Sequence, residues 1–268
     1  MELEKRVNKK ANKHLFEGKT YISSKYGVFK IVEYLGTSQV RVLFDNGYTT
    51  TTTLNSILKD RVKNPTYPVL QGVGYIGVGK YNSKTHKKLY KRWSSMIDRC
   101  YKSILQEKHP TYKDVTVCEE WHNFQNFAKW MEDNYRPETM QGWELDKDLL
   151  SNFTPTYSPE TCCFIPSSLN SLLGFIYSNV VITEIKGKYY INIMVNKVRK
   201  VIKNNTLKEA LEIYVNKRTE QSNIILNKHR DKLPIKIIKR FENLILEIEV
   251  NIKYSLIQKL NHRQKFKI

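Results

Sequence analysis

The sequence predicts an α+β protein that is built from several small parts. Three observations lead to this fold class: short β-branched runs near the N-terminus, aromatic residues at helical spacing in the middle, and a strand–loop–strand–helix order after residue 143. Apolar residues make up 40% of the 268 residues, which is enough to form packed cores. We expect five parts, with these boundaries: 1–58, 59–88, 89–178, 179–232 and 233–268.

The first part is predicted to be an SH3-like β-barrel over residues 16–58. Tyr26-Gly27 and Asn46-Gly47 are turn dipeptides, and the second is a strong hairpin signal. The runs VFKIVEYL and QVRVLF between them, and the threonines that follow, are typical of short strands. Barrels of this kind bind partners more often than they catalyse reactions.

Residues 59–88 are predicted to form a flexible, basic, Gly-rich connector that follows a phosphate backbone. Its glycines resemble a nucleotide-binding loop at first sight. A Walker loop requires Gly-Lys followed by Ser or Thr, whereas Gly79-Lys80 is followed by Tyr81. The mismatch excludes that class of site.

Charge is distributed unevenly along this strongly basic chain, whose formal net charge is +19. Residues 57–113 hold 13 basic and 3 acidic side chains, whereas residues 114–179 hold 3 basic and 10 acidic ones. Basic segments favour a polyanionic partner, of which double-stranded DNA is the one we expect. Clustered carboxylates within a basic protein favour a divalent metal. The alternative is that the Lys-rich, Asn-rich composition reflects an AT-rich genome.

Two aromatic helices precede the segment that carries the predicted chemistry. Leu89, Trp93, Met96 and Cys100 recur at helical spacing, as do the aromatic residues of 119–133, so we expect the two helices to pack on each other. WELDKDLL and TCCFIP then read as two strands, and SSLNSLLGFIY reads as a helix. This order brings the end of the first strand close to the start of the helix. The residues expected there are Asp146, Lys147, Asp148 and Asn170.

Several separated motifs in this region resemble those of phage-encoded HNH-type endonucleases. They are W-x-x-M-x-x-R-C-Y from Trp93, C-x-x-W-x-x-F from Cys118, the acidic–basic–acidic Asp146–Asp148, and Y-S-P-E-x-C before a helix with Asn. The resemblance implies a ββα-metal core in residues 89–178. It also implies that Asp146 and Asn170 hold one Mg²⁺ or Mn²⁺.

In the resembling family a histidine activates water at the position that Lys147 occupies. A lysine between two aspartates keeps its proton, so we expect Lys147 to bind phosphate or stabilise developing charge. The general base stays open between Glu160, Asp148 and His122. A further alternative is that the Asp-Lys-Asp group is a salt-bridged strand end in a core without catalytic activity.

Residues 180–230 read as three strands and a helix and resemble the AP2-like DNA-binding module. Lys186-Gly187 and Asn196-Lys197 are the predicted turns, and Thr206 with Glu209 forms a capping box. A last amphipathic helix is predicted over 234–262. The side chains that we expect to contact DNA lie in this module and in the earlier basic segment: Lys80, Lys87, Lys88, Lys91, Arg92, Arg99, Tyr190, Asn192, Lys197, Arg199 and Lys200.

Taken together, these patterns predict a metal-dependent DNA endonuclease or nickase, the homing type included, in the host cytoplasm. No apolar run is long enough for a transmembrane helix, and residues 1–16 lack the apolar core of a secretory signal. The four cysteines lack the spacing of a zinc site and suit reduced core thiols. Two alternatives stay open: a DNA-binding protein that keeps the HNH fold without catalysis, and a protein that antagonises a host factor through its N-terminal barrel.

Overall fold

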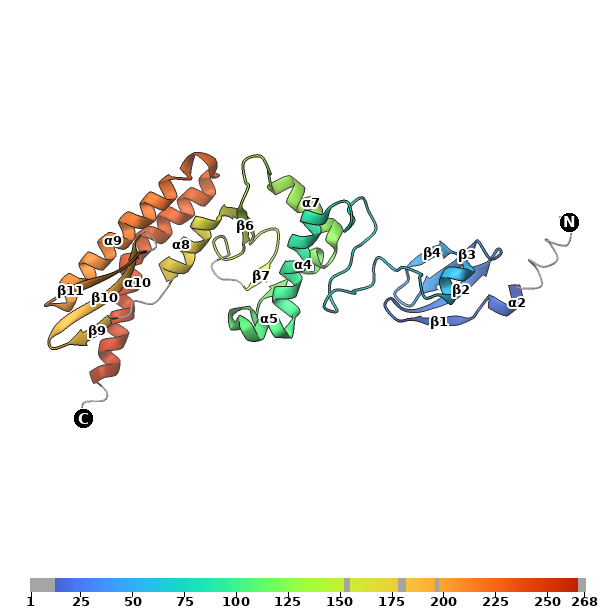
Figure 1. The fold of residues 1–268 in the computed structure, drawn as a ribbon, viewed down its shortest axis with the longest axis horizontal. Helices are drawn as coiled ribbons and strands as arrows, with labels where there is room; N and C mark the ends of the chain where they lie inside the picture. The colour runs from blue at the N-terminus through green and yellow to red at the C-terminus, as the bar shows by residue number, and fades with distance from the viewer. Residues whose placement is uncertain (1–12, 152–154, 178–181, 196–197, 265–268) are drawn as a thin grey trace. The chain divides into compact units, whose positions relative to one another are not determined.

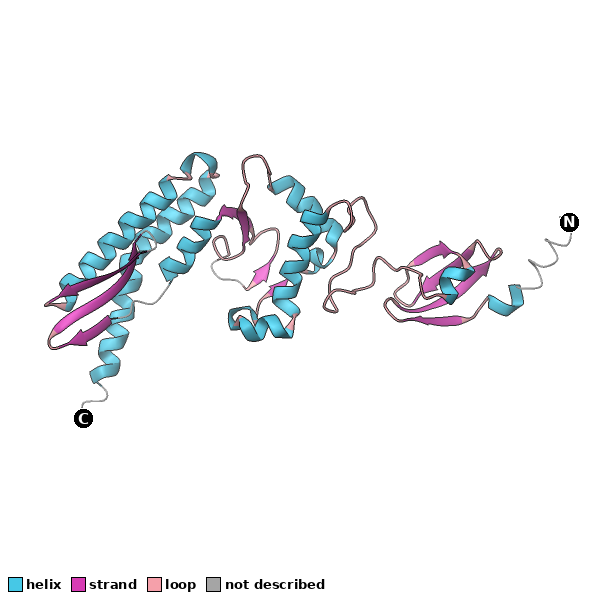
Figure 2. Ribbon diagram, in the orientation of Figure 1, coloured by secondary structure: helices cyan, strands magenta, loops and turns pink. Residues whose placement is uncertain are grey.

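The computed structural model describes residues 13–151, 155–177, 182–195 and 198–264. Helices and small separate sheets alternate along the chain, so the predicted α+β class is confirmed (Figures 1 and 2). Contacts divide the chain into two compact units. The first contains residues up to 133 together with 156–158, and the second contains 134–155 and 159–268. The boundary between the units therefore falls inside the predicted 89–178 core.

The N-terminal part is an open four-stranded antiparallel sheet and not a closed barrel. Its strands pair in chain order, and the described residues contain no pairing of the first strand with the last. Phe29, Ile31, Val42 and Phe44 fill the covered face of the sheet. The elements are α2 (Lys13–Phe16), β1 (Thr20–Ser23), β2 (Gly27–Tyr34), β3 (Val40–Phe44), β4 (Thr49–Thr52) and α3 (Leu54–Leu58). The turns predicted at Gly27 and Gly47 are confirmed, because both glycines have a positive φ.

The Gly-rich segment 59–88 is packed, which corrects the expectation of a flexible connector. Its backbone joins Tyr75 to Asn123 in a β-bridge. The Gln125 side chain accepts a hydrogen bond from the Tyr81 backbone N–H at 3.0 Å and donates to the Tyr81 carbonyl at 2.8 Å. The backbone of this segment therefore hydrogen-bonds to other parts of the protein. Its glycines make this possible, because a residue without a Cβ lets the backbone approach its partners closely.

Helices of the first unit pack through aromatic side chains, as the sequence predicted. Trp93 and Phe124 lie 5.4 Å apart between ring centroids, and Trp93 Nε1 donates to the Trp121 carbonyl at 2.7 Å. The helix expected over 119–133 is interrupted at Asn123. The elements are α4 (Lys87–Tyr101), α5 (Ser103–Lys108), η1 (Pro110–Tyr112), α6 (Glu119–His122) and α7 (Phe124–Asn134), with β5 (Thr116–Val117) paired in parallel to β7 (Thr156–Tyr157).

A strand–strand–helix arrangement opens the second unit. The strand β6 (Trp143–Asp146) pairs antiparallel with β8 (Cys163–Pro166), and α8 (Ser167–Tyr177) begins directly after β8. The helix packs against both strands. This is the order that the sequence predicted for the segment.

A three-stranded sheet and two long helices complete the second unit. The sheet order is β11-β10-β9, and α9 packs against β10 and β11. Thr206 caps α9 by accepting a hydrogen bond from the Glu209 N–H, which confirms half of the predicted capping box. The elements are β9 (Ile182–Ile185), β10 (Lys188–Val195), β11 (Val198–Asn204), α9 (Leu207–Asn227), η2 (Arg230–Lys232) and α10 (Ile235–Gln264).

Helices α8, α9 and α10 contact one another, so the parts predicted at 179–232 and 233–268 share a core with the β6–β8–α8 unit. Ser168 and His229 are hydrogen-bonded at 2.8 Å between Oγ and Nε2. Along α10 the predicted apolar stripe is buried at Ile238, Phe241 and Leu244, whereas Ile235 at the start of the stripe is exposed.

Candidate functional site

The paired strands β6 and β8 determine where the predicted site residues lie. Side chains alternate across a strand, so Glu144 and Asp146 share one face of β6 and Trp143 lies on the other. The amide nitrogen Nδ2 of Asn170, in the first turns of α8, donates a hydrogen bond to Glu144 Oε2. Asn170 therefore lies over the β6 face that also carries Asp146.

Asp146 is buried, and its carboxylate stabilises the turn that follows the strand. The Oδ2 atom accepts hydrogen bonds from the backbone N–H groups of Asp148 at 3.0 Å and Leu149 at 2.8 Å. Only 5% of the residue is exposed. Burial raises the pKa of Asp146 to about 6, against the two backbone hydrogen bonds, which lower it. Within the part of the chain that the structure describes, Oδ1 accepts no hydrogen bond.

Lys147 and Asp148 form an ion pair next to Asp146. The distance from Lys147 Nζ to Asp148 Oδ1 is 2.5 Å, and the side chains are 11% and 38% exposed respectively. The Lys147 carbonyl also accepts a hydrogen bond from Ser151 Oγ at 2.5 Å. The ion pair places the Lys147 ammonium against a carboxylate of the same turn.

The oxygen atoms of Asp146, Asn170 and Glu144 have the chemistry of a site for a hard divalent cation. Carboxylate and amide oxygens are the ligands that Mg²⁺ and Mn²⁺ prefer. The amide that donates through Nδ2 to Glu144 keeps its Oδ1 as a possible ligand. Groups of three or more His, Cys, Asp and Glu side chains placed to hold a metal are absent from the described residues. A metal site here would depend on the Asn170 amide beside the two carboxylates and on ligands from outside the chain.

A general base is not identified by this geometry. His122 belongs to the first unit, where its Nε2 lies 3.5 Å from the Tyr101 hydroxyl, and its backbone carbonyl accepts a hydrogen bond from the Tyr75 N–H. Glu160 is exposed, and Asp148 is paired with Lys147. Cys163 is the cross-strand partner of Asp146. Burial and then the Asp146 carboxylate raise the pKa of its thiol, so it stays protonated near neutral pH.

The outer face of the β9–β11 sheet carries several of the predicted DNA-contacting side chains. Ile191 and Ile193 on β10 are buried against the helix side, so Tyr190 and Asn192 lie on the opposite face. Arg199 Nε donates to Asn192 Oδ1 at 3.0 Å, and Lys203 Nζ lies 5.8 Å from the centre of the Tyr190 ring. These contacts hold polar and cationic groups in fixed positions on one face.

One predicted residue of this module, Lys200, has a different position. Lys200 is the register partner of Ile193, so it lies on the helix-facing side of the sheet, at the exposed end of β11. The prediction placed it with the DNA-facing residues because the strand boundaries, and hence the alternation, were unknown. Lys197 and the predicted Asn196-Lys197 turn lie outside the described residues.

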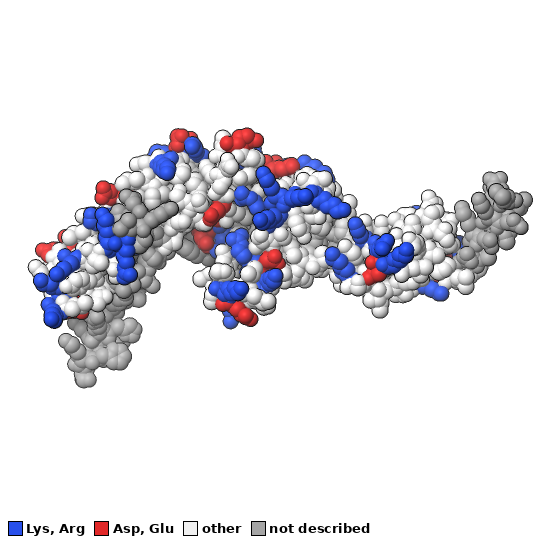
Figure 3. All heavy atoms as spheres, in the orientation of Figure 1, with Lys and Arg blue, Asp and Glu red and all other residues white. Residues whose placement is uncertain are grey.

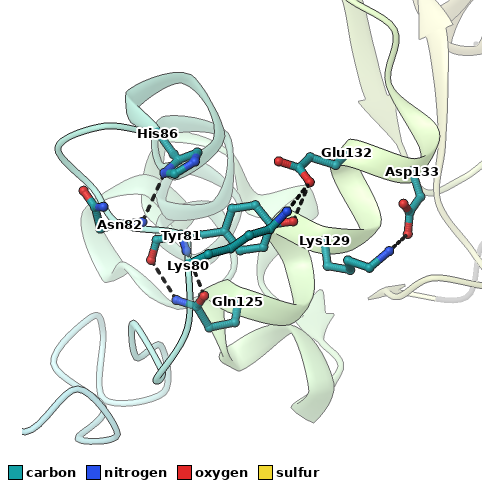
Figure 4. A network of polar contacts seen from close by, with 8 residues as sticks. All are labelled: Lys80, Tyr81, Asn82, His86, Gln125, Lys129, Glu132 and Asp133. Atoms are coloured by element: carbon teal, nitrogen blue, oxygen red, sulfur yellow. Dashed lines mark hydrogen bonds and ion pairs between the residues drawn. The ribbon is translucent and has the colours of Figure 1, made fainter.

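The cations of the first unit that were predicted to contact DNA fall into two groups. Some contact other side chains of the protein, and the others are exposed. Lys80 Nζ pairs with Glu132 Oε2 at 3.0 Å, and the Tyr81 hydroxyl donates to the same oxygen at 2.6 Å (Figure 4). Arg99 lies between the rings of Tyr112 and Tyr157, with centroid distances of 5.7 and 5.6 Å. Both are therefore held by the protein itself, a role that sequence patterns did not indicate.

The predicted DNA-contacting cations of the first unit that are exposed lie along the first half of α4. Lys87, Lys88 and Lys91 are exposed and Arg92 is half-buried. Lys and Arg side chains gather over the α4 and α7 part of the face drawn in Figure 3.

Sequence reasoning missed Glu144 and the cations at the start of α10. Glu144 precedes Asp146 by two residues, a spacing that puts both on one face of a strand, so strand alternation was a usable signal. Lys236 and Lys239 belong to a helix that was interpreted only as a cover for the core. No signal in the sequence links them to residues 149–150.

Comparison of the chain with protein-family models, curated proteins and solved structures finds no match. The resemblance to HNH-type endonucleases and to the AP2-like module therefore stays a prediction. Among the described helices none combines the length and apolar character needed to cross a membrane.

Proposed function

We propose that the chain is a metal-dependent DNA endonuclease or nickase, and that its β6–β8–α8 unit is the HNH-like site. One observation carries the proposal: Asn170 on α8 contacts the β6 face on which Asp146 lies. A strand end that bears a carboxylate, opposite a helix start that bears an amide, supplies hard oxygen ligands from two elements. The net charge of +19 supports a polyanionic substrate.

In this proposal Asp146 and Asn170 hold one Mg²⁺ or Mn²⁺, with Glu144 beside them. A bound divalent ion would supply stabilisation of the negative charge on the departing oxygen of the cleaved phosphodiester. Lys147 contributes positive charge close to that position. Asp148 keeps Lys147 in place through their ion pair.

DNA binding is assigned to two basic surfaces in the same proposal. The first is the exposed part of α4 with Lys87, Lys88 and Lys91. The second is the outer face of the C-terminal sheet, for which we propose an AP2-like role in DNA contact. The open N-terminal sheet is proposed to be an SH3-like relative that binds a partner. Cations on α4 would position the duplex without reading its sequence.

A DNA-binding protein without cleavage is the second candidate, and specific contacts favour it. Asp146 is buried, and one of its oxygens already accepts two backbone hydrogen bonds. Lys147 is neutralised by Asp148, and that ion pair also engages one of the three candidate bases. In that case the charged groups after β6 have a structural role only.

Incubation of supercoiled plasmid with the full chain, with Mg²⁺ and with EDTA, separates the two candidates. The endonuclease proposal expects relaxed or linear plasmid only with Mg²⁺. Binding of a labelled duplex is measured in the same buffers. Plasmid that stays supercoiled while the duplex is bound would refute cleavage and leave the second candidate.

A further inference from the structure

A basic hollow lies at the start of α10, next to the turn that Asp146 stabilises. It has a volume of about 520 Å³, within the range of pockets that hold small ligands. Its lining is formed by three cationic side chains, one amide and two apolar residues: Lys236, Lys239, Arg240, Asn243, Leu150 and Ile235. In the lining that the structure describes, no acidic side chain is present.

The lysines of the hollow lack the carboxylate partners that other cations of the chain have. Lys147 and Arg230 are each paired with an acid in this unit. Lys236 and Lys239 are exposed and form no ion pair with the residues that the structure describes. Two adjacent unpaired cations that converge on one concave surface raise the local concentration of anions.

The position of these lysines within the helix is unfavourable for the protein alone. The first turn of α10 contains no acidic residue. Positive side chains near a helix N-terminus oppose the helix dipole, which favours anions there. An anion bound in the hollow would offset this cost, so the arrangement suits a phosphate ligand.

The hollow is connected to Asp146 through two hydrogen bonds of the Leu149 backbone. Arg240 Nε donates to the Leu149 carbonyl at 3.0 Å, and the Leu149 N–H donates to Asp146 Oδ2 at 2.8 Å. The cations therefore lie beside the strand end that carries the candidate metal ligand.

We infer that this hollow is a binding site for the sugar–phosphate backbone of the DNA strand that enters the Asp146 site. This inference rests on the proposed DNA-directed function and names a contact for it. Lys236 and Lys239 bind the phosphate, and Arg240 is oriented by its bond to Leu149. Leu150 and Ile235, which is 66% exposed, supply apolar surface for a deoxyribose.

Binding of a 20-bp duplex to the full chain, measured by fluorescence anisotropy from 50 to 200 mM NaCl, tests the inference. The variant K236Q/K239Q removes the two exposed charges of the hollow. The matched control K208Q/K217Q removes two exposed lysines of α9 in the same unit, and K236R/K239R keeps the charge. Circular dichroism and the melting temperature check that each variant folds.

Each phosphate contact contributes about 0.9 to the slope of log affinity against log salt. We expect K236Q/K239Q to reduce the magnitude of that slope by about 2, and we expect the control and the arginine variant to match the wild type. Equal changes of the slope in K236Q/K239Q and K208Q/K217Q would overturn the inference. The effect would then reflect general electrostatic attraction between the protein and DNA and not a binding site in the hollow. An unchanged slope in K236Q/K239Q would overturn it while DNA binding stands. A wild-type chain that binds no DNA would remove the proposed function and this inference together.

Discussion

The strand end after β6 and the hollow of α10 are neighbours with opposite electrostatic character. At the strand end the polar side chains have partners within the protein: Asp146 with two backbone N–H groups, Lys147 with Asp148, and the Glu144 carboxylate with the Asn170 amide. In the hollow, Lys236 and Lys239 have no such partners among the described residues. The comparison separates a strand end whose polar groups are held by internal contacts from a hollow whose two lysines have none, and the proposed metal and phosphate sites can be tested independently on that basis.

The largest expected effect is that of salt on the affinity for DNA, to which exposed cations without a partner in the protein contribute most. If six or more phosphates are contacted, the affinity for duplex DNA should fall by about 10³-fold between 50 and 200 mM NaCl. Fluorescence anisotropy with the full chain measures this. An affinity that changes less than about threefold would contradict the assignment of the basic surfaces to DNA.

Removal of the Asp146 charge should abolish cleavage and leave the fold intact. Asp146→Asn keeps an acceptor for the two backbone N–H groups but weakens the metal ligand, so we expect cleavage to fall by at least about 10²-fold. The affinity for DNA should stay close to wild type, because most affinity comes from phosphate contacts elsewhere, and the melting temperature should not fall below that of wild type. Asn170→Ala should likewise reduce cleavage and leave the affinity for DNA close to wild type. Loss of folding in D146N would show instead that the carboxylate is a structural group.

The buried carboxylate should also make stability depend on pH. The folded pKa of Asp146 is raised from 3.8 to about 6, so the proton is bound more tightly in the folded state. Its destabilising contribution is therefore present above pH 6 and is lost as the pH falls towards 4. Relative to D146N, the free energy of unfolding of metal-free wild type should rise by about 2 kcal/mol between pH 7 and pH 4.5. Urea titrations in EDTA measure the difference, and a constant difference would show that the carboxylate is solvated.

The smallest effect is expected at Lys147, which is already neutralised. Lys147→Ala should reduce cleavage by no more than about 10-fold and leave the salt slope unchanged, in contrast to K236Q/K239Q. Plasmid cleavage and duplex binding at two salt concentrations measure the two quantities. A change of about 1 in the slope would mean that Lys147 contacts a phosphate directly and that its ion pair opens on binding.

Local patterns predicted the elements of this fold well. The turns at Gly27 and Gly47, the Thr206 cap and the order of β6, β8 and α8 follow from residue chemistry over a few positions. The prediction that the N-terminal sheet closes into a barrel was wrong, because closure depends on pairing between strands that are distant in sequence.

Contacts between distant segments also explain what the sequence missed in the candidate site. The partner of Asn170 is Glu144, and the Asp146 turn meets Arg240 through the Leu149 carbonyl. The sequence predicted that Lys80 contacts DNA, but Lys80 pairs with Glu132, which is 52 residues away in the chain. Pairings of this kind depend on tertiary packing, which residue spacing does not determine.

Binding of Mn²⁺ is the most direct test of the central claim that Asp146 and Asn170 hold one divalent ion. Electron paramagnetic resonance counts bound Mn²⁺ for the full chain with a duplex, and for the double variant D146A/N170A under the same conditions. We predict about one more bound ion per chain in the wild type than in the variant. Equal Mn²⁺ binding by the two proteins would contradict the account.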